Sequence, residues 1–217
     1  MEPARHSERE FDLSGGVLCL DFANTVSQRK IADQTRDNLP GYDDLVFFAV
    51  ASGVVMPQFA GEILEQSEQK PRERDRVFQA AMNLREAIYR VFAAIANSRA
   101  ARRKDLKLIE EFASEAAKHR QLTATGGSYA WRWKRNKDEA LAYVVWPIAQ
   151  SAAELLTSDQ LKKVRECDAR TCAWLFLDES RNHSRRWCDM GVCGNRQKAR
   201  RHYRKSSQRS VSWRTLV

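Results

Sequence analysis

Residues 167–196 read CDARTCAWLFLDESRNHSRRWCDMGVCGNR and contain four of the five cysteines of this 217-residue chain. The cysteines are spaced C-x4-C, then fifteen residues, then C-x4-C. Two short-spaced pairs of this kind favour a tetrahedral zinc site, in which four thiolates leave no open position for catalysis. The predicted ligands of one structural Zn²⁺ are Cys167, Cys172, Cys188 and Cys193. In so small a segment, metal binding would supply most of the folding free energy.

Other interpretations of these cysteines stay open. Four residues separate each pair instead of the more common two, and His183, between the pairs, offers a substitute for one thiolate. Two disulfides, or four unlinked thiols, would use the same residues. In a reducing compartment, however, grouped cysteines more often hold metal. Cys19 stands apart between two leucines and is expected to be a packed core thiol.

A basic segment follows the last cysteine. Gly194 allows the chain to turn sharply after the last cysteine, and Asn195 is a good N-cap, so a helix is expected from this point. Arginines four apart share one face of that helix, where they repel each other unless a polyanion neutralises them. The predicted nucleic-acid contacts are Arg185, Arg186, Arg196, Lys198, Arg200, Arg201, Arg204 and Lys205.

The positive charge of the chain is concentrated in its last quarter. The whole chain has a net charge of +9, whereas residues 162–217 hold 15 basic and 5 acidic residues. The remainder is therefore close to neutral. A neutral body with a cationic end is typical of a protein with a polyanion-binding tip. We weigh double-stranded DNA first, RNA second and an acidic protein surface third.

The first 160 residues indicate a mainly helical body. In residues 72–97 apolar side chains from Val77 to Ile95 recur at steps of three and four, which forms one stripe. Other helices are expected over 42–52, 57–67, 104–118 and 147–157. The fold class is thus α+β: a mainly helical N-terminal domain with a small antiparallel sheet, plus a small C-terminal zinc module that ends in a basic helix.

The small sheet is predicted from aromatic alternation. Tyr129, Trp131 and Trp133 alternate with small or polar residues. Asn136 to Glu139 is interpreted as a turn, and Ala140 to Trp146 as the returning apolar strand. The sequence therefore predicts a hairpin across residues 129–146.

Membrane and enzyme functions find little support in the sequence. The first twelve residues are polar, and the longest apolar run, Leu45 to Ala51, is too short to cross a bilayer. We expect a cytoplasmic protein with no membrane partner that joins the nucleoid when bound. The sequence carries no glycine-rich phosphate loop, nucleophile elbow or histidine/carboxylate cluster, so we expect no enzyme. Because distant groups can converge, an enzyme anchored by the finger stays open.

A polar trio near the N-terminus offers a candidate ligand pocket. Asp21, Asn24 and Thr25 lie beside apolar residues and are able to line such a pocket. The simpler interpretation, which we favour, is that they cap a helix and satisfy buried backbone groups.

Residues 167–196 resemble the CGNR zinc-finger family, whose naming motif is Cys193-Gly194-Asn195-Arg196 here. The body looks like the ABATE domain that usually precedes this finger, on residues 20–25, 84–87 and 151–156. The resemblance implies a stress-linked bacterial transcription regulator. It divides the chain into an ABATE-like domain (1–160), a finger with its basic helix (161–206) and a tail (207–217).

The sequence also leaves partners and alternative functions open. The body would sense an unknown small-molecule effector or form a homodimer. An RNA-binding or ribosome-associated factor that uses the same basic patch is the alternative function. Oxidation of the thiolates, with release of zinc, would add a redox switch.

Overall fold

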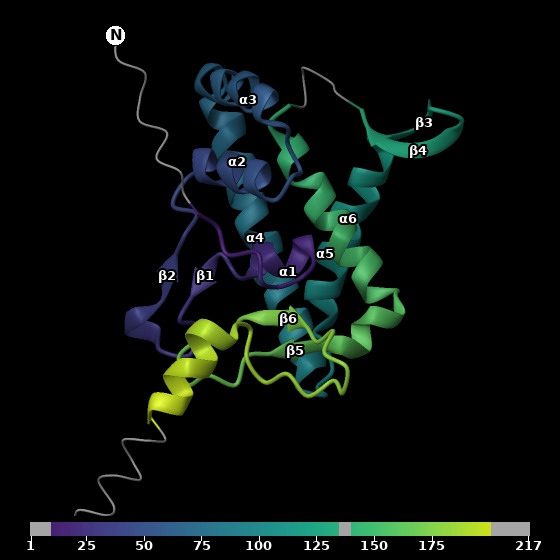
Figure 1. Cartoon of the computed structure of the whole chain (residues 1–217). Helices are drawn as coiled ribbons and strands as arrows, with labels where there is room; N and C mark the ends of the chain where they lie inside the picture. Colours follow the sequence, from purple (N-terminus) through teal and green to yellow (C-terminus); the bar gives the residue numbers. More distant parts are fainter. Residues whose placement is uncertain (1–9, 135–139, 201–217) are drawn as a thin grey trace, which may run out of the picture.

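The computed structural model describes residues 10–134 and 140–200 (Figure 1). Its α-helices are α1 (Leu18–Ala23), α2 (Tyr42–Ala51), α3 (Pro57–Gln69), α4 (Pro71–Ala96), α5 (Arg103–Lys118) and α6 (Trp146–Leu156). Its strands form two-stranded antiparallel ribbons: β1 (Val26–Ser27) with β2 (Arg36–Asp37), β3 (Arg120–Thr125) with β4 (Ser128–Trp133), and β5 (Val164–Glu166) with β6 (Leu175–Leu177). The α+β class with a helical body and small antiparallel sheets is confirmed.

Helix α4 forms the centre of the body. The predicted apolar stripe is buried along most of its length, and Leu84, Ile88 and Phe92 are fully inaccessible. Helices α1, α2, α3 and α5 and the ribbon β5–β6 all pack against α4, while α1 also contacts α6. The short buried helix α1 therefore lies between the body helices and the C-terminal module (Figure 1). Among the described residues, no helix combines the length and apolar character needed to cross a bilayer.

The predicted hairpin across residues 129–146 is wrong. Strand β4 pairs with the preceding strand β3, with Thr125 opposite Ser128 and Arg120 opposite Trp133. A Gly126-Gly127 turn joins them, with φ of 53° and 86°. Two successive positive φ values are what a two-residue hairpin loop requires, and glycine adopts them without strain. The expected turn at 136–139 lies outside the described residues.

The expected returning strand, Ala140 to Trp146, instead forms a 3-10 turn, η3 (Ala142–Val144), and the start of α6. Pro147 lies in the first turn of α6. The backbone N–H that proline lacks would have no partner at this point of a helix, so proline favours a helix start over a strand here. The apolar run is buried because this helix packs into the core, and not because it pairs with β4.

The β3–β4 hairpin projects from the body (Figure 1). Leu122 and Trp131 are direct cross-strand partners, so their side chains lie on the same face, and Tyr129 shares that face. These three side chains are 60%, 59% and 75% exposed, respectively. Trp131 therefore does not pack in the core, whereas Trp146 is buried and stacks on His119 with ring centroids 3.7 Å apart.

The ribbon β5–β6 joins the cysteine-rich segment to the body. Val164, Leu175 and Leu177 belong to the same buried cluster as the body helices. The side-chain amide of Asn24, just after α1, donates to the carbonyl of Leu175 and accepts from its N–H, both at 2.8 Å. The indole N–H of Trp174 donates to the carbonyl of Val26 at 3.0 Å. The segment is thus held on the body by backbone as well as apolar contacts.

Candidate metal centre and nucleic-acid interface

The four predicted ligands converge at the end of the β5–β6 ribbon. The Sγ atoms of Cys167, Cys172, Cys188 and Cys193 all lie within 4.8 Å of one another, and all four residues are buried. The Sγ of Cys188 is 3.6 Å from that of Cys172 and 3.7 Å from that of Cys193. The five cysteines of the chain are all described, and none is in a disulfide. His183 is not part of the cluster; its Nδ1 is 3.0 Å from the carbonyl oxygen of Asp178.

The donor set fits a zinc ion. Four sulfurs at about 2.3 Å from a tetrahedral Zn²⁺ would lie about 3.8 Å from each other, which is close to the separations between these thiols. Burial, followed by the negative charge of Cys167, raises the pKa of Cys193. Neighbouring cysteines and burial likewise raise the pKa of Cys188. A divalent cation would relieve this repulsion, so the cluster holds one structural Zn²⁺ with all four positions taken by protein.

Backbone contacts position the first cysteine pair. The N–H of Cys167 donates to the carbonyl of Trp174 at 2.8 Å, and this bond closes the loop that carries Cys172. The N–H of Trp174 points at the Sγ of Cys172, 3.4 Å away. Lys30, from the body, donates to the carbonyl of Cys167 at 2.6 Å. The wide C-x4-C loop is therefore fixed from both sides, which the spacing by itself did not indicate.

A buried carboxylate organises the loop between the pairs. Asp178 is fully inaccessible. Its Oδ1 accepts from the N–H and hydroxyl of Ser180, at 3.0 and 2.5 Å, and its Oδ2 accepts from the N–H of Arg185 at 3.0 Å. These bonds close the loop from Asp178 to Arg185, which leads to Cys188. The sequence offered no specific signal for the role of Asp178.

Two of the predicted nucleic-acid contacts take part in building the module. Arg185 donates to the backbone carbonyls of Trp187 and Cys188, and its guanidinium lies 4.6 Å from the centre of the Phe176 ring. These contacts hold the loop that leads into Cys188, and a role of Arg185 in nucleic-acid binding stays a prediction. Arg186 is more than half exposed, pairs with Asp168 at 2.7 Å and keeps its charge at the surface.

The remaining basic residues follow the last ligand. Cys193 lies in a π-helical turn, η5 (Met190–Gly194), which continues directly into helix over residues 195–200. The prediction that this helix starts at Asn195 is therefore wrong: Asp189 is the N-cap, and its side chain accepts from the N–H of Val192. Arg196, Lys198 and Arg200 are all exposed on that helix. Arg196 also lines a cavity of about 300 Å³ beside the metal centre. The predicted contacts Arg201, Arg204 and Lys205 lie outside the described residues.

Comparisons with protein families find two matches along the chain. Residues 16–159 match the ABATE family, described as "Putative stress-induced transcription regulator". The chain belongs to the ABATE family. Residues 163–206 of this ABATE protein match the CGNR zinc finger, so both resemblances noted in the sequence are confirmed. No curated protein matches the chain.

The polar trio of the ABATE body has structural partners. Asp21 Oδ1 accepts from the N–H of Gly15 at 2.8 Å, and Asn24 holds Leu175 as described above. The hydroxyl of Thr25 donates to a carbonyl three residues earlier in the chain, at 2.8 Å. All three residues are buried. These side chains thus pair with buried backbone groups, and a role in a ligand pocket stays a prediction.

Asp21 gives the ABATE body a pH dependence. Burial, opposed by backbone hydrogen bonds, raises the pKa of its carboxyl to about 7. The unfolded chain, with a pKa of about 3.9, releases this proton at lower pH. The contribution of Asp21 to stability is therefore lost as pH rises through 7, by about 1.4 kcal/mol between pH 6 and pH 8. Urea denaturation at both pH values measures the free energy of unfolding.

The Asp21→Asn variant keeps an acceptor for Gly15 but has no proton to lose. We expect the pH 6 to pH 8 change in its unfolding free energy to differ from that of the unmodified protein by this amount. Any effect of pH on zinc binding is common to both proteins and cancels in the difference. Identical pH profiles would contradict the assignment.

Proposed function

We propose that this ABATE protein is a cytoplasmic transcription regulator that binds double-stranded DNA through its zinc finger and the basic helix that follows. The zinc fixes the start of the helix, and the exposed arginines meet the phosphates. Guanidinium groups suit this role because they bind phosphate oxygens in a bidentate way. The body would regulate the finger, in keeping with the description of its family.

One observation carries this proposal: the last zinc ligand and the first exposed arginine belong to one continuous helical segment. Cys193 is buried in the metal centre, whereas Arg196, one turn later, is exposed. Arg200 is four residues further and lies on the same face. A metal-anchored helix with cations on its free face is the arrangement that zinc modules use to place helices on DNA.

Fluorescence anisotropy with a labelled duplex tests the proposal. If about six phosphates are neutralised, the logarithm of affinity falls against the logarithm of salt concentration with a slope near −5. The double variant Arg196→Ala/Arg200→Ala is expected to lower affinity about tenfold or more and to flatten the slope by about 2, with zinc still at one per chain. Replacing Arg204 as well should lower affinity further.

A matched control is available on α4. Arg72 and Arg76 are also exposed and four residues apart, so Arg72→Ala/Arg76→Ala removes the same charge from a site away from the finger. This control should bind duplex DNA as the unmodified protein does. A salt-independent affinity would rule out phosphate contact as the main source of binding. Tighter binding to a structured RNA hairpin would favour the alternative RNA-binding function.

A homodimer is the assembly that we infer for the body. The exposed apolar face of the β3–β4 hairpin, with Leu122, Tyr129 and Trp131, supports it. Both long edges of a two-stranded ribbon also offer unpaired backbone groups to a second copy. A two-fold dimer would present two fingers to two DNA half-sites. Sedimentation velocity measures the oligomeric state.

A further inference from the structure

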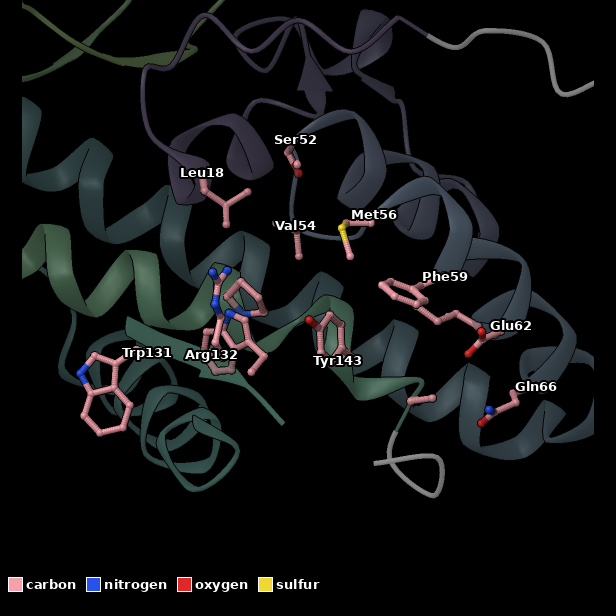
Figure 2. Close-up of a pocket in the computed structure, with 15 residues that line it drawn as sticks. Leu18, Ser52, Val54, Met56, Phe59, Glu62, Gln66, Trp131, Arg132 and Tyr143 are labelled. Atoms are coloured by element: carbon pink, nitrogen blue, oxygen red, sulfur yellow. The ribbon is translucent and has the colours of Figure 1, made fainter. Parts of the chain in front are cut away.

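The ABATE body contains a cavity of about 960 Å³ that is not used by the metal centre (Figure 2). One wall comes from α3 and the loop before it, with Met56, Phe59 and Ile63. The opposite wall comes from β4, η3 and the start of α6, with Trp133 and Tyr143. Its volume is in the range that accepts a whole small organic molecule, and its aromatic and aliphatic side chains offer contact to the apolar part of such a molecule.

Arg132 is the one arginine among the lining residues, and it is exposed to solvent. Arg132 comes from β4, and Figure 2 shows its guanidinium directed towards Leu18 and Val54. Within residues 10–134 and 140–200 it makes no hydrogen bond, ion pair or ring contact. The carboxylate of Glu62 lies at the far side of the cavity in Figure 2, so it does not neutralise this cation.

We propose that this cavity binds an organic monocarboxylate with an aromatic or branched apolar body, and that the carboxylate meets Arg132. Guanidinium is the side chain best suited to a carboxylate because it donates two parallel hydrogen bonds. The body of the ligand would lie between Phe59 and Trp133. Gln66, near Glu62, offers a further polar contact at the far end.

The position of the cavity gives the ligand a route to the finger. Leu18, the first residue of α1, lines the cavity. Asn24, at the other end of this short helix, holds the backbone of Leu175 in β6. A ligand that moves α1 therefore acts on the strand that precedes the second cysteine pair. We assign the ligand the role of effector of DNA binding, which rests on the function proposed above.

Calorimetric titration of the zinc-loaded full chain tests the site without DNA. The probes are 4-phenylbutyrate and its neutral amide, 4-phenylbutyramide, which share the same apolar body. We expect the acid to bind about fivefold more tightly than the amide, because the charge-assisted bond to Arg132 is partly screened by solvent. Arg132→Gln should remove this preference, and Phe59→Ala should weaken both probes about tenfold.

Arg103→Gln is the matched control, since Arg103 is exposed on α5 and does not line the cavity. It should keep the full preference for the acid. Equal affinities of the two probes for the unmodified chain, an acid preference that survives Arg132→Gln, or no saturable binding up to about 10 mM would overturn the site.

Duplex affinity is then measured with and without saturating 4-phenylbutyrate: a change of about threefold or more supports the effector role. An unchanged affinity overturns that role and leaves the binding site and the DNA-binding function standing.

Discussion

Removal of zinc is expected to lower duplex-DNA affinity by about two orders of magnitude or more while it leaves the helical body folded. Binding of a structural zinc ion is worth on the order of 10–16 kcal/mol, and the cluster around the four cysteines adds few apolar side chains of its own. Without the ion, the start of the basic helix has no anchor. The variant Cys188→Ser/Cys193→Ser should behave like the chelator-treated protein. Elemental analysis, circular dichroism and anisotropy measure zinc, helix content and affinity.

Cys19 supplies the control for this experiment. It is fully buried in the body, away from the cluster, and burial raises the pKa of its thiol to about 12. Cys19→Ala should therefore keep one zinc per chain and full DNA affinity, with a loss of about 1 kcal/mol of body stability. If the zinc-free protein bound duplex DNA as tightly as the zinc-loaded one, the metal would not position the interface.

Asn24→Ala is expected to destabilise the protein by about 3 kcal/mol. The amide of Asn24 pairs with both the N–H and the carbonyl of Leu175 in a buried setting. Removing it leaves two buried backbone groups unsatisfied, each at a cost of about 1–3 kcal/mol. Urea denaturation measures the loss, with zinc content followed in parallel.

The matched control for Asn24 is Asn38→Ala. Asn38 is exposed, and its amide donates to the hydroxyl of Ser27 at 3.4 Å. Its replacement should change the unfolding free energy by less than about 0.5 kcal/mol. Equal stability of the two variants would mean that Asn24 does not join the finger to the body. Asn24→Asp should also destabilise, because a carboxylate accepts from the N–H of Leu175 but repels its carbonyl oxygen.

The hairpin error has an identifiable physical origin. Aromatic alternation locates β4 correctly, but the run from Ala140 to Trp146 is apolar and of strand length, so it also fits the pattern of a partner strand. Short apolar runs do not distinguish a buried helix start from a strand. The stronger local signal was Gly126-Gly127, whose two positive φ values close the hairpin with β3.

The basic patch shows a different limit of sequence reasoning. Charge and proximity to the cysteines grouped Arg185 with the exposed arginines. In the structure its guanidinium meets Phe176 and two backbone carbonyls and thus braces the module. Sequence assigns a charge to a residue, but the direction of a long side chain depends on the partners that the fold brings within reach.

Short-range patterns in the sequence were enough to indicate the metal centre and the helical body. The start of the basic helix was misplaced: the helical segment begins after the Asp189 cap, and Asn195, the predicted N-cap, lies inside it. Cysteine spacing, helical periodicity and capping residues act over a few positions, so they need no knowledge of the fold. Folding alone brought Asn24 to Leu175, buried Asp178 under its loop and placed Arg132 opposite Phe59 in one cavity. Such pairs are joined by packing between residues far apart in the chain, and no short-range pattern encodes which distant partner a side chain will meet.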